Sequence, residues 1–339
     1  MKKIISSIYN VFVNKKNSNY DEGTSEIFYV KSKVISIGNI CAGGTGKTPL
    51  TETIAKYLLE KEKIVTIAAK GYKGDFKSDL LVRDYKNLYS SVDECGDEMF
   101  MLAQNINIPI VVNSDKYKAA QYLDAKFSPN FIILDDGFQH RKLHRDLDII
   151  ILDKDSIYNP FILPQGLLRE PIENIDRADV ICVTEDLLSD ENFNQIIKRY
   201  TTKNQLIVGL KTIIIGIYNT KKEKISINQP VMLLSGIGIN SKFHKSCKDY
   251  GLTIKGIMEY KDHYKYTLNE IKSIAKIAVE DNIYNIITTE KDYVKLLPFI
   301  NVFIQNNIKL YYLRIETEIT YNKEKLFDKI MKLQNDRDN

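Results

Sequence analysis

A strand, a glycine-rich loop and a helix follow one another in this chain, and this unit constrains the fold more than any other feature. Residues 34–37 form an apolar run typical of a buried strand, and residues 49–60 carry apolar side chains at helical spacing. The loop between them reads Cys41-Ala42-Gly43-Gly44-Thr45-Gly46-Lys47-Thr48. In this order the three parts build a cradle for phosphate groups.

The loop predicts a nucleoside triphosphate site. Backbone N–H groups of such a loop, with those of the helix N-terminus, point at anionic oxygens. In this pattern Lys47 reaches the β- and γ-phosphates, and the Thr48 hydroxyl holds Mg²⁺. The predicted nucleotide-binding residues are Gly43, Gly44, Thr45, Gly46, Lys47 and Thr48. The usual pattern has a glycine where this chain has Cys41, and the alternative interpretation is a turn that binds no ligand.

Strand-like runs alternate with helical stretches. They are residues 34–37, 64–68, 108–112, 131–134, 148–152 and 180–183. The alternation predicts an α/β fold with a P-loop NTPase-like parallel sheet sandwiched by helices, and ligands at the carboxyl ends of its strands. A second series of runs predicts a smaller α/β domain. The expected divisions are a P-loop domain at 17–205, an extended β-rich linker at 206–218 and the smaller domain at 219–339.

Composition narrows the class of protein. The 339 residues suffice for two domains, and a net charge of +4 argues against a nucleic-acid partner. The four cysteines form no C-x-x-C pair, which excludes the common zinc spacings and is typical of reduced thiols in a cytosol. No run of 18 apolar residues occurs, so we expect no membrane-spanning helix.

Residues 1–16 predict an amphipathic helix that associates with a membrane. The apolar side chains at helical spacing are Ile4, Ile5, Ile8, Val11 and Phe12, flanked by Lys2, Lys3, Lys15 and Lys16. A stripe of this kind between basic residues can lie in an anionic membrane surface. The alternative is a helix that packs the stripe against its own domain.

Two carboxylates follow the apolar run at 131–134. They open the segment Asp135-Asp136-Gly137-Phe138-Gln139-His140. In P-loop enzymes an acid at the end of a strand near the phosphate loop holds Mg²⁺. The pattern does not decide which of Asp135 and Asp136 touches the ion. The alternative is a turn in which an aspartate caps the next segment.

Other polar segments are also suited to chemistry. Asp97 and Glu98 open a predicted helix, where capping of the helix N-terminus is the alternative role. His263 follows an aspartate and can carry a proton, with a structural histidine as the alternative. Arg169 and Glu170 lie in a loop bounded by prolines, which either presents the arginine to an anion or serves as a rigid connector.

Together these motifs resemble the tetraacyldisaccharide 4′-kinases, the lipid A 4′-kinase family of Gram-negative bacteria. The resemblance runs from near residue 8 to about residue 297. Its motifs are Ile35-Ser36-Ile37-Gly38-Asn39, Gly43-Gly44-Thr45-Gly46-Lys47-Thr48-Pro49, Gly71-Tyr72, Gly96-Asp97-Glu98, Leu134-Asp135-Asp136-Gly137-Phe138-Gln139-His140-Arg141, Arg145-Asp146-Leu147-Asp148, Leu163-Pro164, Leu168-Arg169-Glu170-Pro171, Ser235-Gly236-Ile237-Gly238, Asp262-His263 and Thr289-Glu290-Lys291-Asp292. Many NTPases share the phosphate loop, but the Asp-Asp-Gly-Phe-Gln-His and Leu-Arg-Glu-Pro segments are far more specific.

The resemblance implies a kinase that transfers the γ-phosphate of ATP to the 4′-hydroxyl of a tetraacylated glucosamine disaccharide 1-phosphate. The product would be the lipid A precursor lipid IVA of lipopolysaccharide biosynthesis. It also implies a peripheral position on the cytoplasmic face of the inner membrane, with its anionic surface as partner. No obligate protein partner is expected.

The resemblance also implies roles for individual residues. Asp97 looks like the catalytic base and His263 like its partner. The implied Mg²⁺ ligands are Thr48, Asp135, Asp136 and Glu98, and the implied substrate-binding residues are Gln139, His140, Arg169 and Glu170. The smaller domain would close the substrate cleft.

The chain departs from the family pattern at two places. Ala69-Lys70 stands where the family often has Ser-Arg, and Met99 stands where it often has proline. Two rival functions are a membrane-associated P-loop ATPase switch without a phosphorylated product, and a kinase of a soluble sugar. In Thr289-Glu290-Lys291-Asp292 the lysine comes one place late for a guanine-specific switch, which argues against GTP.

Overall fold

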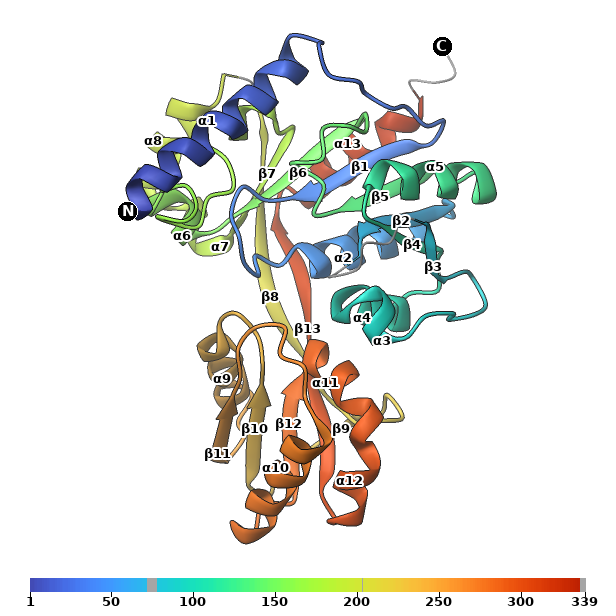
Figure 1. Ribbon diagram of the computed structural model, residues 1–339, viewed down its shortest axis with the longest axis vertical. Helices are drawn as coiled ribbons and strands as arrows, with labels where there is room; N and C mark the ends of the chain where they lie inside the picture. Colours follow the sequence, from blue (N-terminus) through green and yellow to red (C-terminus); the bar gives the residue numbers. More distant parts are fainter. Residues whose placement is uncertain (72–77, 203, 336–339) are drawn as a thin grey trace. The chain divides into compact units, whose positions relative to one another are not determined.

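The computed structural model describes residues 1–71, 78–202 and 204–335, and the chain divides into two compact units (Figure 1). The first unit comprises Met1–Ser90, Ile106–Lys211 and Thr317–Asn339, and the second comprises Ser91–Asn105 and Thr212–Glu316. Two long strands, β8 (Leu206–Tyr218) and β13 (Lys309–Tyr321), each contribute residues to both units.

The first unit is built on a mostly parallel sheet with the strand order β8-β7-β6-β1-β5-β2-β4-β3. Its shorter strands are β1 (Lys33–Gly38), β2 (Val65–Lys70), β3 (Leu80–Arg83), β4 (Ile110–Asn113), β5 (Phe131–Asp135), β6 (Leu147–Leu152) and β7 (Val180–Thr184). β1 pairs in parallel with β5 and β6, and β3 runs antiparallel to β4 at the edge. β5 and β6 are buried along their whole length, as a sheet covered on both faces requires.

Helices α2 and α5 cover opposite faces of this sheet. Ile132 and Leu134 of β5 belong to one apolar cluster with Leu123 of α5. Asp135 follows on the same strand and accepts a hydrogen bond from Thr51 of α2. Successive side chains of a strand alternate between its faces, so the two helices lie on different sides. The helices of this unit are α1 (Lys2–Asp21), α2 (Lys47–Glu60), α5 (Lys116–Phe127), α6 (Lys154–Tyr158), η1 (Ile172–Arg177), α7 (Glu185–Leu188), α8 (Glu191–Tyr200) and α13 (Lys323–Asn335).

The strands of the second unit form the other part of the same 13-stranded sheet, paired in parallel in the order β11-β10-β12-β13. The strands are β10 (Val231–Ser235), β11 (Ile254–Glu259) and β12 (Asn285–Thr289), and β9 (Lys224–Ile225) forms a hairpin with β8. The helices are α3 (Val92–Cys95), α4 (Asp97–Asn105), α9 (Asn240–Asp249), α10 (Leu268–Glu280), α11 (Glu290–Leu296), η2 (Leu297–Phe299) and α12 (Ile300–Gln305). Phe303, Ile271 and Leu296 lie in its core.

The expected α/β class, with its mostly parallel sheet, is confirmed. The sequence predicts domain divisions at 205 and 219, and the structure divides the chain differently. Residues 91–105 belong to the second unit, because α4 packs against α11 there. Residues 317–339 belong to the first unit, where the Tyr57 ring of α2 stacks on Phe327 of α13 with ring centroids 3.6 Å apart. Residues 206–218, predicted as a linker, form the strand β8.

The N-terminal helix α1 ends at Asp21, later than the predicted residue 16. Within the residues that the structure describes, no helix has both the length and the apolar character needed to cross a bilayer.

We expect Phe131→Ala to lower the free energy of unfolding of the first unit by about 3–5 kcal/mol. Phe131 lies fully buried in β5, so truncation removes its apolar contacts and leaves a cavity. Chemical denaturation followed by circular dichroism measures the change. Phe12→Ala is the matched control, because the Phe12 ring is 69% exposed on α1. A Phe131→Ala variant as stable as its parent would show that this ring is not part of the core.

Candidate active site

The loop between β1 and α2 leaves open space beside its backbone. Gly43 and Gly46 have φ values of +120° and +88°, in the region that favours glycine. A Cβ atom added at Gly43, Gly44 or Gly46 would meet no heavy atom within 4 Å. α2 begins at Lys47, directly after Gly46, so the N-terminal amides of this helix adjoin the loop. The arrangement fits a bound phosphate group.

The first half of the loop is extended, which explains why it tolerates Cys41. Cys41 forms an antiparallel bridge with Leu168, and backbone hydrogen bonds join residues 40–42 to residues 167–169. The Cys41 side chain is buried, and its Sγ accepts a hydrogen bond from Ser156 Oγ at 3.1 Å. An extended residue whose side chain faces the core does not need the conformational freedom of glycine.

Asn39 connects the loop to its surroundings through two hydrogen bonds. Its side-chain Nδ2 donates to Thr45 Oγ1 at 2.8 Å, which ties the end of β1 to the second half of the loop. Its main-chain oxygen accepts from Gln139 Nε2 at 2.7 Å, which joins the loop to the segment after β5. Asn39 is fully buried, so these bonds hold the loop without competition from water.

Asp136 gathers three cations at the carboxyl end of β5. Lys47 Nζ lies 3.6 Å from Oδ1, and Arg169 Nη1 donates to Oδ2 at 2.8 Å. Lys116 Nζ donates to the main-chain oxygens of Asp135 and Asp136, where Asp136 has a φ of +49°. Burial alone would raise the pKa of Asp136, but the charges of Lys116, Lys47 and Arg169 outweigh it and lower that pKa to about 2.

The two neighbouring aspartates differ in the hydrogen bonds that their carboxylate oxygens accept. Asp135 Oδ1 accepts from Thr51 Oγ1 at 3.0 Å. Asp136 Oδ1 is buried, and no described residue donates a hydrogen bond to it. Among the described residues, no group of three or more His, Cys, Asp or Glu side chains could hold a metal ion. The carboxylate of Asp136 offers an oxygen of the kind that Mg²⁺ prefers, and this ion is commonly held by one or two protein groups together with phosphate oxygens.

Glu170 is a buried junction between segments. It is 1% exposed and accepts hydrogen bonds from four side chains. The donors are Gln139 Nε2 at 2.6 Å, Asn17 Nδ2 at 3.2 Å, Asn174 Nδ2 at 3.0 Å and Arg177 Nη2 at 2.9 Å. The carboxylate thereby links α1, the segment after β5 and η1.

His140 is held neutral inside the first unit. Its Nε2 accepts from the Tyr117 N–H at 3.2 Å, a bond that only an unprotonated nitrogen can accept. Burial, and then the positive charges of Lys116 and Lys16, lower the pKa of His140 to about 3.

Asp97 lies in an ion-pair network of the second unit. Its Oδ2 is 3.2 Å from His263 Nδ1, 3.9 Å from Lys291 Nζ and 3.7 Å from Lys295 Nζ. Burial would raise the pKa of Asp97, but the hydrogen bond of His263 and the charges of Lys291, His263 and Lys295 lower it below its usual value. Asp97 is therefore an ionised carboxylate, although it is 6% exposed.

Lys291 contacts the other polar groups of this network. Its Nζ is 3.1 Å from Glu98 Oε1, 3.3 Å from Asp262 Oδ1 and 3.4 Å from His263 Nε2. An ammonium group can only donate, so in the neutral imidazole Nε2 accepts from Lys291 and Nδ1–H donates to Asp97.

The structure brings most of the predicted residues into two groups. The phosphate loop, Asp136, Gln139 and Arg169 meet in the first unit. The sequence predicts Asp97 and His263 in different domains, but both belong to the second unit and are in contact. Glu98 also lies in that unit, whereas the other predicted metal ligands lie in the first. Tyr72 of the Gly71-Tyr72 motif lies outside the described residues.

Three of the residues that complete these groups were not singled out from the sequence. They are Thr51, Lys116 and Lys295. Asn39 and Lys291 were noted only as parts of motifs. Two signals in the sequence could have found the missed lysines: Lys116 lies at the start of a helical stretch that follows a strand, and Lys295 comes four residues after Lys291, on the same helix face.

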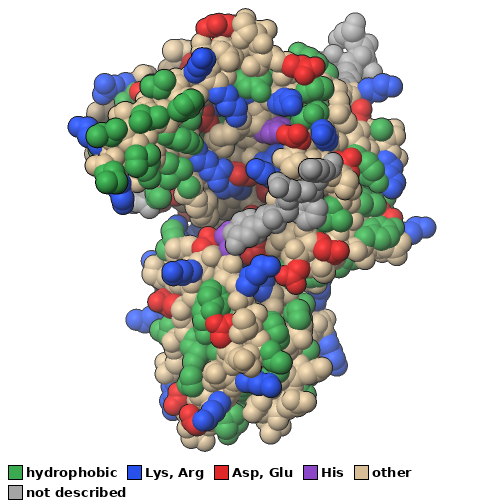
Figure 2. All heavy atoms as spheres, in the orientation of Figure 1, with side chains coloured by type: hydrophobic (Ala, Val, Ile, Leu, Met, Phe, Trp, Pro, Cys, Tyr) green, Lys and Arg blue, Asp and Glu red, His purple; other side chains and the backbone are tan. Residues whose placement is uncertain are grey.

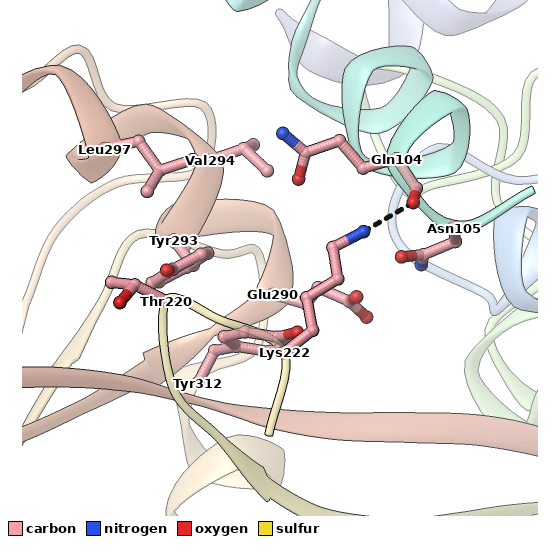
Figure 3. Close-up of a pocket in the computed structure, with 9 residues that line it drawn as sticks. All are labelled: Gln104, Asn105, Thr220, Lys222, Glu290, Tyr293, Val294, Leu297 and Tyr312. Atoms are coloured by element: carbon pink, nitrogen blue, oxygen red, sulfur yellow. Dashed lines mark hydrogen bonds between the residues drawn. The ribbon is translucent and has the colours of Figure 1, made fainter. Parts of the chain in front are cut away.

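A small cavity of about 110 Å³ lies elsewhere in the second unit (Figure 3). Gln104 of α4, Lys222 and Tyr293 of α11 are among its lining residues, and Lys222 Nζ donates to the Gln104 main-chain oxygen at 2.6 Å. None of the site residues predicted from the sequence lines this cavity.

A parallel sheet, a glycine loop that opens a helix and an acid at the end of the neighbouring strand define a P-loop α/β protein. The model of one family, described as Tetraacyldisaccharide-1-P 4′-kinase, matches residues 2–335. The chain therefore belongs to the tetraacyldisaccharide 4′-kinase family, and it is a kinase.

Individual relatives support the same assignment. The chain is 36% identical over 306 residues to the tetraacyldisaccharide 4′-kinase of Aquifex aeolicus, covering 89% of this chain and 91% of that protein. It is 32% identical over 341 residues to the enzyme of Halothermothrix orenii, covering 93% and 88%. A crystal structure of LpxK from Aquifex aeolicus in complex with ATP matches with a TM-score of 0.78 and 32% identity, covering 97% of each chain.

We expect the free energy of unfolding to fall as the pH drops below the ordinary histidine pKa of 6.5, because of His140. Between that value and the folded pKa of about 3, the unfolded chain binds a proton at this residue and the folded chain does not. Stability therefore rises with pH in this window, by up to about 1.4 kcal/mol per unit.

Denaturant titrations at about pH 5.0, 5.5 and 6.0, all inside this window, measure the slope. The slope should be smaller in a His140→Gln variant and should persist in the control His144→Gln, whose ring stacks on the exposed Tyr29. An unchanged slope in His140→Gln would mean that His140 is protonated equally in both states.

Proposed function

We propose that this kinase transfers the γ-phosphate of ATP to the 4′-hydroxyl of a tetraacylated glucosamine disaccharide 1-phosphate in lipid A biosynthesis. The observation that carries the proposal is the open glycine loop beside the ion-paired Asp136, in a chain of the 4′-kinase family. The crystal structure of the Aquifex aeolicus relative in complex with ATP supports ATP as the phosphate donor.

The nucleotide phosphates would lie against Gly43, Gly44, Thr45 and Gly46, where the backbone is open and the helix N-terminus begins. Lys47 pairs with Asp136 and also donates to the Gly43 oxygen at 3.3 Å. With ATP present, the Lys47 ammonium would bind phosphate oxygens in place of Asp136 and the Gly43 oxygen. Its positive charge would then offset the negative charge of the transferred group.

Asp136 and Thr48 are the residues that we propose for Mg²⁺. When bound, Mg²⁺ neutralises negative charge on the phosphate oxygens. Asp136 is favoured over Asp135 because its Oδ1 is buried without a hydrogen-bond donor, whereas Asp135 is engaged by Thr51. Glu98 remains a predicted ligand, and its carboxylate is paired with Lys291.

Asp97 is the base that we propose for the acceptor hydroxyl. A sugar hydroxyl is a weak nucleophile, and a carboxylate that takes its proton contributes about 10²–10⁴-fold to the rate. The hydroxyl oxygen forms the new bond to the γ-phosphorus, its proton moves to Asp97, and ADP leaves. His263 orients the carboxylate through Nδ1. The charges that lower the pKa of Asp97 keep it ionised and ready to accept.

Arg169 is the group that we propose for an anion of the substrate or nucleotide. Its side chain is 28% exposed and only one of its nitrogens, Nη1, is engaged with Asp136. Glu170 and Gln139 hydrogen-bond to each other, Gln139 also donates to the Asn39 oxygen, and His140 Nε2 accepts from the Tyr117 N–H. We propose that Glu170, Gln139 and His140 position Arg169 and the loop. Closure of a cleft by the smaller domain stays a prediction.

The outward face of α1 is the surface that we propose for the cytoplasmic face of the inner membrane. Its apolar residues are exposed, with Ile4 at 67%, Val11 at 66% and Phe12 at 69%. Figure 2 shows hydrophobic side chains gathered over this helix. The alternative, a stripe packed on its own domain, does not fit this exposure. Lys16 differs from the prediction, because its Nζ turns inward to the Gln139 oxygen at 3.3 Å.

We expect Asp97→Asn to lower kcat by about 10²–10⁴-fold, because it removes the proton acceptor and keeps the shape of the side chain. Transfer of label from [γ-³²P]ATP to the disaccharide 1-phosphate in detergent micelles measures kcat. Asp93→Asn is the matched control, since the Asp93 side chain is 79% exposed and its ion-pair partner Lys265 is exposed too.

The same assay separates the rival functions. If the parent enzyme released label only as free phosphate, it would be an ATPase without a phosphorylated product. Equal efficiency with the deacylated disaccharide would indicate a kinase of a soluble sugar. Near-parental kcat in Asp97→Asn would remove Asp97 as the base.

We expect the triple variant Ile8→Ser, Val11→Ser, Phe12→Ser to bind phosphatidylglycerol-containing vesicles at least about 10-fold more weakly, because each apolar side chain adds to burial in the bilayer interface. Co-sedimentation measures the binding. Ile257→Ser is the control, at an isoleucine that is 52% exposed on β11. Unchanged sedimentation of the triple variant would contradict the proposed membrane surface. Point substitutions are preferable to deletion of residues 1–16. The deletion would also remove Ser6 and Tyr9, whose hydroxyls bond to main-chain oxygens of Ile162 and Arg169.

A further inference from the structure

Helix α1 turns its polar side chains toward the protein and its apolar ones outward. Its buried residues are Ser6 and Asn17, and Tyr9 between them is half-buried. A surface helix of a globular protein normally does the reverse. Apolar packing therefore does not explain how the polar face of α1 is held, and the hydrogen-bond partners of this face indicate its role.

Those partners lie in the segment that leads to Arg169. Ser6 Oγ donates to the Ile162 oxygen and accepts from the Gln165 N–H, both at 3.0 Å. Tyr9 OH donates to the main-chain oxygen of Arg169 at 3.0 Å. Ser6 and Tyr9 are three residues apart, on one face of the helix, so a single helix surface holds both ends of this segment.

The segment between them is a tight turn outside the regular elements. Residues 162–169 consist of turns, bends and isolated bridges, and the N–H of Leu163 donates to the Leu168 oxygen at 2.8 Å. A Cβ atom at Gly166 would collide with the Phe161 carbonyl oxygen. The end of the segment pairs with residues 40–42 of the phosphate loop, and Arg169 reaches Asp136 from there at 2.8 Å. Hydrogen bonds from residues 40–42 on one side and from α1 on the other thus hold the Arg169 backbone.

We infer that Ser6 and Tyr9 are positioning residues for Arg169. Their hydroxyls hold the 162–169 segment so that the guanidinium meets Asp136 beside the phosphate loop. The inference rests on the proposed function of Arg169 and Asp136. It means that the helix proposed to meet the lipid surface also sets the geometry of the nucleotide site, through hydroxyl groups on its opposite face.

Two minimal variants test the inference, because each removes one hydroxyl and leaves the apolar face of α1 intact. Tyr9→Phe and Ser6→Ala should each lower kcat about 3- to 10-fold in detergent micelles, the range expected for one lost hydrogen bond. KM for the lipid substrate and binding to phosphatidylglycerol-containing vesicles should stay at parental values. The matched control is Ser7→Ala, because the exposed Ser7 hydroxyl donates within its own helix, to the Lys3 oxygen at 3.1 Å. Parental kcat in both test variants would overturn the inference.

A double-mutant cycle distinguishes positioning of Arg169 from a general loss of stability. In an Arg169→Ala background, Tyr9→Phe should cause no further loss of kcat, because no guanidinium remains to be placed. Full additivity of the two effects would overturn the inference and leave the proposed role of Arg169 intact. Parental kcat in Arg169→Ala alone would instead refute the role of Arg169 in the proposed function, and the inference with it. Thermal unfolding of each variant, with melting temperatures close to the parent, shows that the proteins remain folded.

Discussion

The carboxylate of Asp136 is the group on which the proposed nucleotide site depends. Three cations converge near it, and each comes from a different part of the first unit: Lys47 opens α2, Lys116 opens α5 and Arg169 ends the segment after residue 162. Without the carboxylate, these positive charges would face one another in a largely buried place, where repulsion is strong. The ion pairs therefore join elements that are distant in the sequence. They also give the phosphate loop a resident anion, which a bound phosphate would replace as the partner of Lys47.

Local patterns predicted the parts of this site that are close together in the sequence. The glycine loop follows β1 directly, and Asp135 and Asp136 end β5, so strand periodicity and motif spacing located both. Partners from distant elements were beyond such patterns. Nothing local to Lys116 indicates that its ammonium caps the backbone of Asp135, and nothing in Glu170 indicates that four donors surround it. The edge strand β3 was also missed, because its four residues are too few to show a period.

The second unit also contains a contact between distant elements that local sequence patterns do not show, and this contact decides where the domain boundaries lie. Residues 91–105 lie between two strands of the first sheet in the sequence, so order along the chain favours one domain for all of them. Packing of α4 on α11 decides otherwise, and it gives Asp97 the lysines that keep it ionised. Burial disfavours the charge of the Asp97 carboxylate, but the hydrogen bond of His263 and the charges of Lys291, His263 and Lys295 outweigh it. The contacts made inside the second unit thus decide the charge of this carboxylate.

Helix α1 has an apolar face and a polar face, and the sequence pattern predicts only the apolar one. The apolar stripe is periodic and easy to recognise, whereas Ser6 and Tyr9 are ordinary polar residues whose importance depends on the carbonyl groups they meet. Exposed apolar side chains are unfavourable in water, so a helix held in place by polar contacts keeps that stripe available for another apolar phase. Ser6 and Tyr9 bond to the segment that carries Arg169, whereas Asn17 and Lys16 bond to Glu170 and to the Gln139 oxygen. The face of α1 opposite the stripe is therefore joined to several of the residues that surround the phosphate loop.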